Sequence, residues 1–264
     1  MAHVRSNRRT LDLRNLKVAA YQAPLLRSGS LEALDLIRAR VEWCEAQGVE
    51  ILGCPEAILG GLADYSPDPV RFAIDARGDR LTTLLAPLAS DTVTTIVGFT
   101  EVASGRLYNA AAVFHKGTVI GLYRKRHPAI NRSIYEAGDQ TPVFRVGSLV
   151  FGIVICNDSN YPDPARLMAA QGATAIFIPT NNGLPPNRAH DDLVADARRA
   201  DIALAVANHV WVIRADVAGQ ASGLTSVGSS GIVDPNGMVR QAAGRFAEEA
   251  LVAEIDPKAG DEDV

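Results

Sequence analysis

Along most of this 264-residue chain, short apolar runs that predict strands alternate with amphipathic segments that predict helices. The first run covers residues 17–22, and a helix is predicted over residues 30–48, where apolar side chains recur three and four positions apart. A chain built only from helices or only from strands would lack this alternation. The pattern therefore predicts an α/β domain in which layers of helices pack on sheets.

The remaining predicted elements continue the alternation to the end of the chain. Further strands are predicted over residues 51–54, 94–102, 108–115, 119–124, 144–146, 149–156, 175–179, 205–214, 229–233 and 250–255, and further helices over residues 78–90, 162–171 and 191–201. Because no Pro-, Gly- or Ser-rich linker and no internal repeat divides them, we predict a single domain over residues 17–256. We expect residues 1–16 to form a flexible basic arm and residues 257–264 an acidic tail.

Charge and composition exclude several classes of function. The formal net charge is −4 and no basic stripe is present, so we expect no nucleic-acid partner. No apolar run approaches the roughly 20 residues of a membrane span, and the Arg-rich start does not resemble a secretory signal. We therefore expect a cytoplasmic protein without a membrane partner. The three cysteines, Cys44, Cys54 and Cys156, are too few for a disulfide framework and form no C-x-x-C pair, so we expect no metal site.

Three chemically reactive side chains lie at or just beyond the ends of predicted strands. They are Glu56, Lys125 and Cys156. Such ends are where loops gather to form sites in α/β proteins. A lone cysteine in this position is more often packed in a core than reactive. Here the turn at residues 157–160 leads the backbone out of the strand directly after the thiol, where amide N–H groups can face a reacting oxygen. This turn favours a reactive cysteine.

The segments around these side chains resemble the signature blocks of the nitrilase, or carbon-nitrogen hydrolase, superfamily. Residues Pro55–Gly61 resemble the glutamate block of that family, Tyr123–His127 its lysine block and Gly152–Asp158 its cysteine block. Their order and spacing along the chain agree with the family as well. The resemblance extends over residues 17 to 256 through further segments at residues 18–22, 162–173, 178–181 and 230–237.

The resemblance implies a four-layer α-β-β-α sandwich that hydrolyses a non-peptide carbon-nitrogen bond without a metal or organic cofactor. It implies a small-molecule amide or nitrile as the substrate, and self-association, commonly as a homodimer. Cys156 would be the nucleophile and Glu56 the base that takes its proton. Lys125, together with the backbone N–H of Asn157, would stabilise the oxyanion that forms during attack.

Two positions depart from the family pattern. A further glutamate usually follows the lysine block, whereas this chain has Asn131 at that position; Glu136 is the nearby carboxylate that could replace it. Many amidase-like members carry an aromatic residue after the cysteine, whereas this chain has Asn157. The predicted substrate-binding residues are Asn157, Asp158, Asn131, Glu136 and Asn181. Of these, Asp158 and Asn181 could instead fix a loop.

The remaining cysteines and the histidines have simpler interpretations. We expect Cys44 in the core and Cys54 buried near the edge of the pocket. His127 is expected to pack against or orient the lysine block. Neither His190 nor His209, which is placed within a strand, has the local sequence that a protease-type cysteine–histidine dyad would need.

Several interpretations of the function remain open at this point. A nitrilase and an N-carbamoyl amidase would use the same mechanism as an amidase, because pocket shape selects among their substrates. A catalytically idle binding homologue would fit the replacement of a carboxylate by Asn131. An acyltransferase would pass the acyl group from Cys156 to an amine or alcohol instead of water.

Overall fold

The structure is a computed structural model that describes residues 14–30, 32–129, 133–188 and 192–257. Its strands form two sheets. The first has the order β11 (Leu224–Ser226), β10 (Val217–Ala221), β1 (Leu16–Pro24), β2 (Ile51–Gly53), β3 (Thr94–Ala103), β4 (Arg106–His115) and β5 (Thr118–Arg124), and β14 (Glu249–Ile255) also pairs with β1. The second has the order β13 (Val239–Ala242), β12 (Gly231–Val233), β9 (Trp211–Ala215), β8 (Ala175–Pro179), β7 (Leu149–Ile153) and β6 (Val143–Val146).

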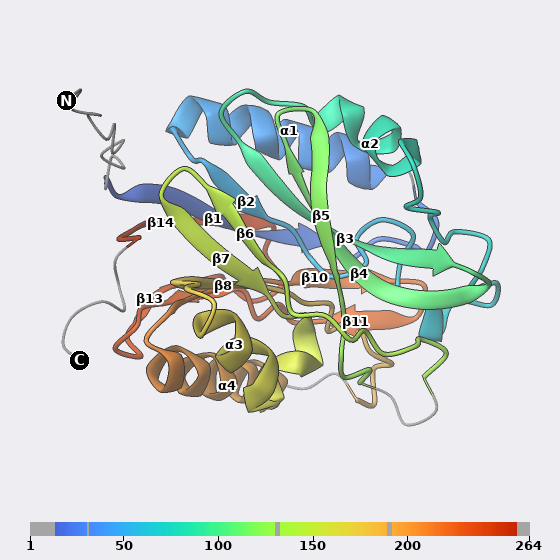
Figure 1. Cartoon of the computed structure of the whole chain (residues 1–264). Coiled ribbons are helices and arrows are strands. Elements are labelled where there is room, and N and C mark those ends of the chain that lie inside the picture. Colours follow the sequence, from blue (N-terminus) through green and yellow to red (C-terminus); the bar gives the residue numbers. More distant parts are fainter. Residues whose placement is uncertain (1–13, 31, 130–132, 189–191, 258–264) are drawn as a thin grey trace, which may run out of the picture.

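Helices cover the outer face of each sheet, as Figure 1 shows. They are α1 (Glu32–Gln47) and α2 (Arg80–Leu85) over the first sheet, and α3 (Pro162–Ala169) and α4 (Asp192–Asn208) over the second. Short 3₁₀ turns are η1 (Ala63–Tyr65), η2 (Ala86–Leu88) and η3 (Cys156–Asn160). The predicted α-β-β-α sandwich is confirmed. No helix within the described residues is long and apolar enough to span a membrane.

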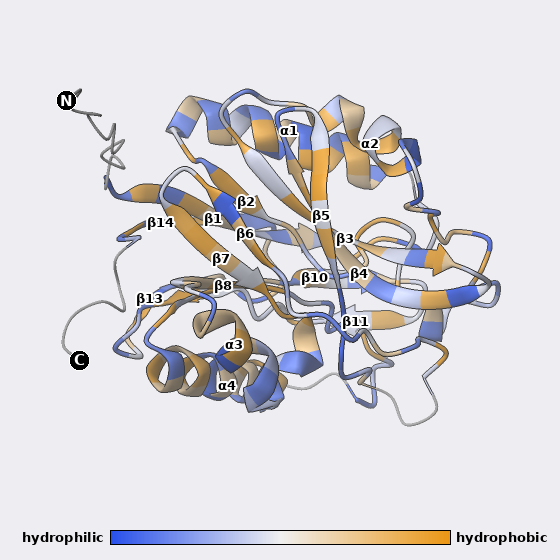
Figure 2. Cartoon of the chain, viewed as in Figure 1, coloured by the Kyte–Doolittle hydropathy of each residue, from blue (hydrophilic) through white to orange (hydrophobic). Residues whose placement is uncertain are grey.

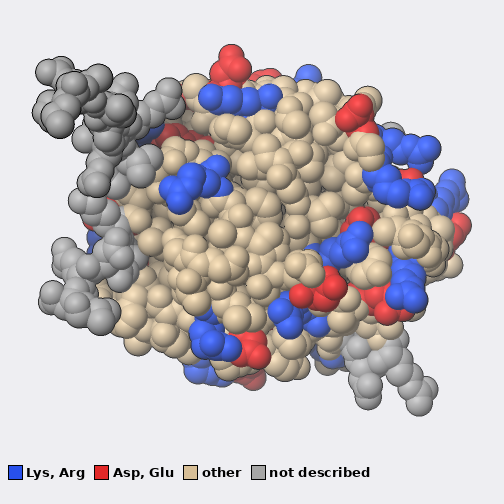
Figure 3. All heavy atoms as spheres, viewed as in Figure 1, with Lys and Arg blue, Asp and Glu red and all other residues tan. Residues whose placement is uncertain are grey.

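The alternation of side chains along β1 explains why the layers stack. Val18 and Ala20 belong to the apolar cluster between the two sheets, whereas Ala19 and Tyr21 belong to the cluster under α1. Successive residues of a strand point to opposite faces, so a strand that is apolar at every position is buried on both sides. Figure 2 shows hydrophobic residues concentrated in the strands and hydrophilic ones in loops and on parts of the helices. On the face in Figure 3, acidic and basic residues are interspersed.

The boundary between α4 and β9 differs from the sequence-based prediction. The strand predicted over residues 205–214 begins only at Trp211, because α4 continues to Asn208. His209, with a φ of 52°, ends the helix in the left-handed region, and the Val210 N–H donates to Ala205 O at 3.2 Å. That is how helices commonly terminate. A short apolar run does not distinguish a buried strand from a buried helix, which explains the error. The strands β10 and β11 were not predicted.

The strand that was predicted to end on the third cysteine is also shorter. Its ladder with β8 ends at Ile153, and Cys156 begins η3 with a φ of 46°. The nucleophile candidate therefore lies on the turn beyond the strand. The predicted domain limits remain predictions, since most of the basic arm and of the acidic tail lies outside the described residues.

Candidate active site

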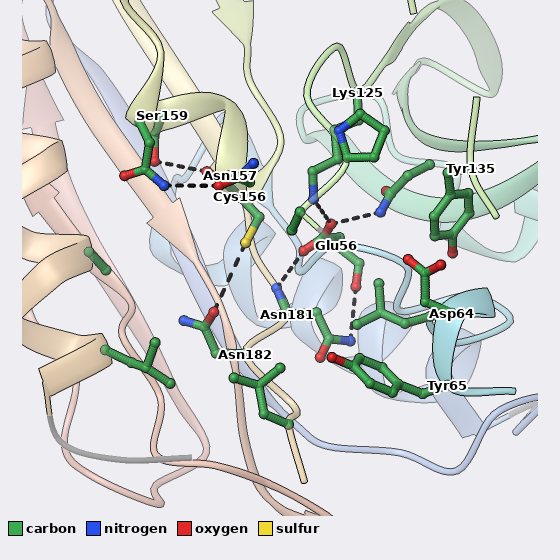
Figure 4. A pocket seen from close by; sticks show the side chains of 18 of the residues that line it. Glu56, Asp64, Tyr65, Lys125, Tyr135, Cys156, Asn157, Ser159, Asn181 and Asn182 are labelled. Atoms are coloured by element: carbon green, nitrogen blue, oxygen red, sulfur yellow. Dashed lines mark hydrogen bonds and ion pairs between the residues drawn. The ribbon is translucent and has the colours of Figure 1, made fainter. Parts of the chain in front are cut away.

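A cavity of about 280 Å³ contains all three members of the predicted triad in its lining. Glu56 comes from the segment after β2, Lys125 from the residue after β5, and Cys156 from the first position of η3. β2 and β5 belong to the first sheet, whereas η3 follows β7 of the second sheet. The cavity therefore forms where strand ends of the two sheets meet. Figure 4 shows the three side chains converging on one space.

Glu56 is held by hydrogen bonds to both of its carboxylate oxygens. Its Oε1 accepts from Lys125 Nζ at 2.6 Å and from Asn109 Nδ2 at 2.7 Å, and its Oε2 accepts from the backbone N–H of Asn181 at 2.9 Å. The side chain is only 1% exposed. A buried carboxylate with this many donors keeps one orientation. Close approach of β3 requires Gly98, because a Cβ there would overlap the Glu56 backbone.

Lys125 is buried almost as completely as Glu56. Burial lowers the pKa of this ammonium, but the opposing charge of Glu56 and the nearby Cys156 outweigh it, so the pKa is raised overall. The residue is anchored through its backbone as well, since its N–H donates to Asn109 O and its carbonyl accepts from Gly138 N–H, both at 2.8 Å. Lys125 is therefore a fixed cation in a buried position, where its field is strong.

Cys156 has a strained backbone and a protonated thiol. A non-glycine residue at a φ of 46° lies in the sparsely populated left-handed region, which is common at functional turns. Burial and the neighbouring Glu56 carboxylate raise the pKa of the thiol to about 12. With its pKa raised in this way, the thiol would need a base in order to act as a nucleophile. Its Sγ lies 4.0 Å from Asn182 Oδ1.

The turn after Cys156 leaves a backbone donor available. Within the described part of the chain, the N–H of Asn157 donates to no acceptor, whereas that of Asp158 donates to Ile155 O at 3.0 Å. The side chain of Asn157 donates to His127 O at 3.1 Å and lines the cavity. A free N–H beside a nucleophile, opposite a buried ammonium, is an arrangement that can bind an oxyanion.

Asp158 joins the turn at Cys156 to the lysine block. Its Oδ1 accepts from the backbone N–H of His127 at 2.7 Å, and its Oδ2 accepts from Tyr123 Oη at 2.7 Å and from Ile155 N–H at 3.0 Å. The side chain is fully buried and is not among the described residues that line the cavity. The structure places Asp158 behind the site instead of within reach of substrate.

The other predicted substrate-binding residues separate into three groups. Asn157 and Asn181 line the cavity beside the triad. Glu136 is exposed and absent from the described lining, although its backbone N–H donates to Leu107 O at 2.8 Å. Asn131 lies outside the described residues. The alternative in which Glu136 replaces the second glutamate of the family finds no support in this placement.

Several lining residues were missed from the sequence. They are Asp64, Tyr65, Asn109, Tyr135, Asn182 and Arg188. Asp64 accepts from Ser133 Oγ at 3.0 Å, and Tyr135 Oη accepts from Ala63 N–H at 2.7 Å, so η1 is tied to the segment that follows the lysine block. Only Asn182, which directly follows the predicted Asn181, could have been found by position.

A second buried ion pair supports the cavity from the side of α4. Arg214 donates from Nε to Asp201 Oδ1 at 2.9 Å, from Nη1 to Thr180 Oγ1 at 2.7 Å and from Nη2 to Ser159 Oγ at 2.9 Å. Because it joins α4, η3 and the residue that follows β8, this guanidinium fixes the turn that begins at Cys156. Among the residues placed by the structure, no group of three or more His, Cys, Asp or Glu side chains is arranged as metal ligands are.

Comparison with known proteins identifies the family. The family model for carbon-nitrogen hydrolases matches residues 17–262. The chain belongs to the carbon-nitrogen hydrolase family. It is 36% identical over 214 residues to a nitrilase from Pyrococcus abyssi, covering 80% of this chain and 78% of the relative. It is 30% identical over 214 residues to an (R)-stereoselective amidase from Pseudomonas sp, covering 80% of this chain and 74% of that enzyme.

Solved structures share the fold of this carbon-nitrogen hydrolase. A mutant of the Nesterenkonia AN1 amidase from the nitrilase superfamily superposes with a TM-score of 0.79 at 22% identity, covering 92% of each chain. Nit3 of Saccharomyces cerevisiae, described as a member of branch 10 of that superfamily, superposes with a TM-score of 0.77 at 22% identity, covering 93% of this chain and 92% of Nit3.

Proposed function

We propose that this carbon-nitrogen hydrolase cleaves a small amide through a thioester on Cys156, with Glu56 as the base and Lys125 as the fixed cation. The observation that carries the proposal is the convergence of the Cys156 thiol and a 2.6 Å Glu56–Lys125 ion pair on one cavity. Amides are poor electrophiles, so covalent catalysis helps by dividing hydrolysis into two easier steps.

In the first step, Cys156 Sγ attacks the amide carbon while its proton passes to Glu56. Because the pKa of the thiol is raised, proton transfer accompanies attack instead of preceding it. Negative charge then develops on the substrate oxygen, where Lys125 Nζ and the free N–H of Asn157 would stabilise it. Glu56 returns the proton to the nitrogen, the C–N bond breaks, and ammonia or an amine leaves the thioester behind.

In the second step, water replaces the sulfur. The water oxygen attacks the thioester carbon while Glu56 takes a proton from the water. The C–S bond then breaks, and Glu56 passes the proton to the departing sulfur of Cys156. The products are a carboxylic acid and the original thiol. The hydrogen bonds from Asn109 and Asn181 keep the Glu56 carboxylate in one place through both steps.

The names of relatives support an amide substrate without deciding it. They include the (R)-stereoselective amidase and an N-carbamoylputrescine amidase from Solanum tuberosum, which is 35% identical over 175 residues, but also the Pyrococcus nitrilase. One solved structure of the Nesterenkonia amidase shows the result of Michael addition of acrylamide at its active site cysteine. A cavity of about 280 Å³ has a size that suits a small substrate.

The proposed roles of the remaining residues follow from their positions. Asn157 and Asn181 contact or border the substrate, whereas Asp158 is a positioning residue for the turn at Cys156. The family resemblance also leads us to propose a homodimer, which sedimentation-velocity analysis would test. A single species at the mass of one chain would contradict it.

An ammonia-release screen over small amides, nitriles and ureido acids tests the proposed function. We expect release from at least one amide by the wild-type enzyme and none by Cys156→Ala. Equal release by Cys156→Ala would contradict the mechanism. Product analysis with an added amine separates hydrolysis from acyl transfer, because an acyltransferase would form the new amide. An idle homologue would release no ammonia and form no acyl adduct.

A further inference from the structure

Asn182 lies beside Cys156 and has no part in the proposed mechanism. It follows β8, lines the cavity, and presents its Oδ1 to Cys156 Sγ at 4.0 Å. Behind it lies Asp216, the residue after β9, which is fully buried. The contact between the two is double, because Asp216 Oδ1 accepts from the Asn182 backbone N–H and Oδ2 from Asn182 Nδ2, both at 3.0 Å.

The partners of the Asn182 amide determine which way it faces. Ser229 donates its hydroxyl proton to Asp216 Oδ2 at 2.6 Å, so Ser229 Oγ is left as an acceptor, and it accepts from Asn182 Nδ2 at 3.2 Å. Both hydrogens of the Asn182 NH₂ group are thus directed at oxygens on the side away from Cys156. An amide turned the other way would place its oxygen against the Asp216 carboxylate, two acceptors in contact.

Asp216 is itself fixed by further donors. Its Oδ1 also accepts from Val217 N–H at 2.8 Å and its Oδ2 from Ser229 N–H at 3.0 Å. A buried carboxylate with this many hydrogen bonds cannot rotate without leaving donors unpaired, which is costly in a buried site. The Asn182 oxygen is therefore a preorganised acceptor beside the sulfur.

A substrate nitrogen would lie close to this oxygen. When Sγ approaches the substrate carbon to about 3–3.5 Å, the nitrogen bonded to that carbon lies near the sulfur as well. A carboxamide or ureido NH₂ can donate to Asn182 Oδ1. A nitrile nitrogen has no hydrogen and would bring a second acceptor against it, and an ester oxygen has none to donate either.

We propose that Asn182, oriented by Asp216 and Ser229, binds the N–H of the scissile nitrogen and makes this enzyme selective for amides and ureido compounds over nitriles. The inference rests on the proposed function, since it assumes that Cys156 is the nucleophile. It supplies a distinction that the Glu56, Lys125 and Cys156 side chains alone do not, because they would serve either substrate class.

The test compares three substrates that share one acyl group. They are the primary amide that releases most ammonia in the screen, the methyl ester of the same acid and the corresponding nitrile. In Asn182→Leu we expect kcat/KM for the amide to fall at least about tenfold, the size of one hydrogen bond. For the ester we expect kcat/KM to change less than about threefold, because the leaving oxygen carries no hydrogen that Asn182 Oδ1 could accept. The wild type should prefer the amide to the nitrile by about 100-fold or more.

The control is Asn236→Leu, which makes the same change at an exposed position outside the described cavity lining and should leave the amide-to-ester ratio unchanged. If Asn182→Leu does not fold by circular dichroism, Ser229→Ala removes one of the two oxygens that orient the amide and should lower the ratio by about threefold.

The inference would be overturned if Asn182→Leu left the amide-to-ester ratio of kcat/KM unchanged, whether or not both values fell. It would also be overturned by a wild type that hydrolyses the nitrile as fast as the amide. Those results would leave the proposed function standing. Ester hydrolysis that persists in Cys156→Ala would instead contradict the proposed function itself.

Discussion

Cys54 and Cys156 occupy similar places in the two sheets, yet only Cys156 lies in the cavity with Glu56 and Lys125. Each follows an apolar strand of the sandwich, β2 and β7, and burial raises the pKa of both thiols. Cys54 is fully buried and lies outside the described cavity lining, while Cys156 lines it from a strained turn. The turn at Cys156 and the charges that face it distinguish this cysteine from Cys54.

The end of β2 contributes to the site in a different way. Two residues after Cys54 the chain places Glu56 in the cavity, so the end of β2 contributes the proposed base and the end of β7 the proposed nucleophile. The backbone differs accordingly, since the left-handed residue is Ala57 in the first case and Cys156 itself in the second. Ala57 turns the chain beside Glu56, and Cys156 turns it at its own position. The side chains of Glu56 and Cys156 therefore both point into the cavity.

Replacing the two cysteines tests this difference with the largest expected effect. Cys156→Ala should lower kcat/KM for the best amide by about 10⁴-fold or more, the loss typical of a missing nucleophile. Cys54→Ala should leave kcat/KM within twofold and lower the free energy of unfolding by about 1 kcal/mol through lost packing. Steady-state kinetics and urea unfolding measure both. Comparable activity losses in the two variants would remove the distinction.

The charge that faces Cys156 is the next test. Lys125→Met should lower kcat about 10²–10³-fold by removing an oxyanion donor. It should also destabilise the fold by about 3–5 kcal/mol, because Glu56 would remain as an unpaired buried carboxylate. Lys17→Met, which changes an exposed lysine on β1, is the matched control for both measurements. Wild-type kcat in a folded Lys125→Met enzyme would refute the role of this cation.

The turn after Cys156 is tested through Asp158. Asp158→Asn keeps the shape of the side chain, but the amide has one acceptor oxygen whereas the carboxylate has two. Some of the hydrogen bonds that join the lysine block to the turn are therefore lost. We expect kcat to fall about tenfold and the free energy of unfolding by about 1–3 kcal/mol, with KM nearly unchanged. The control Asp163→Asn alters an exposed aspartate of α3 and should change neither. A rise in KM at constant kcat would instead indicate direct contact with substrate.

The pH dependence of stability gives a smaller effect. The pKa of Cys156 rises from 9.0 to about 12 on folding. Between these values the unfolded chain has lost a proton that the folded chain retains. The stabilisation associated with the neutral thiol is therefore complete below pH 9 and is lost as the pH rises towards 12. Thermal unfolding between pH 7 and 10.5 should show a shallower decline in Cys156→Ala than in the wild type; parallel curves would contradict the raised pKa.

The sequence predicted the elements that carry strong local signals. The strand over residues 175–179 has the bounds of β8, and α1 begins and ends within two residues of its prediction. Glu56, Lys125 and Cys156 lie together because they are close to strand ends, and strand ends meet in space. Their roles remain a proposal.

The rest of the site could not be predicted because it depends on distant contacts. Asn109 sits within β4 and reaches Glu56 only because β4 and the segment after β2 approach each other in the folded sheet. Asp216 follows β9 and orients Asn182 across the second sheet. Neither residue has a motif around it. The sequence left open whether Asp158 lines the pocket or fixes a loop, and the structure leaves it out of the described cavity lining.

Trapping the acyl-enzyme tests the central claim most directly. The wild-type enzyme is mixed with the best amide, quenched in acid within milliseconds, digested and analysed by mass spectrometry, with Cys44 and Cys54 as internal controls. We predict an added acyl mass on the peptide that contains Cys156 and none on the other two. Turnover of the amide with no acyl mass on Cys156 at any quench time, or with the acyl group on Cys54, would contradict the account.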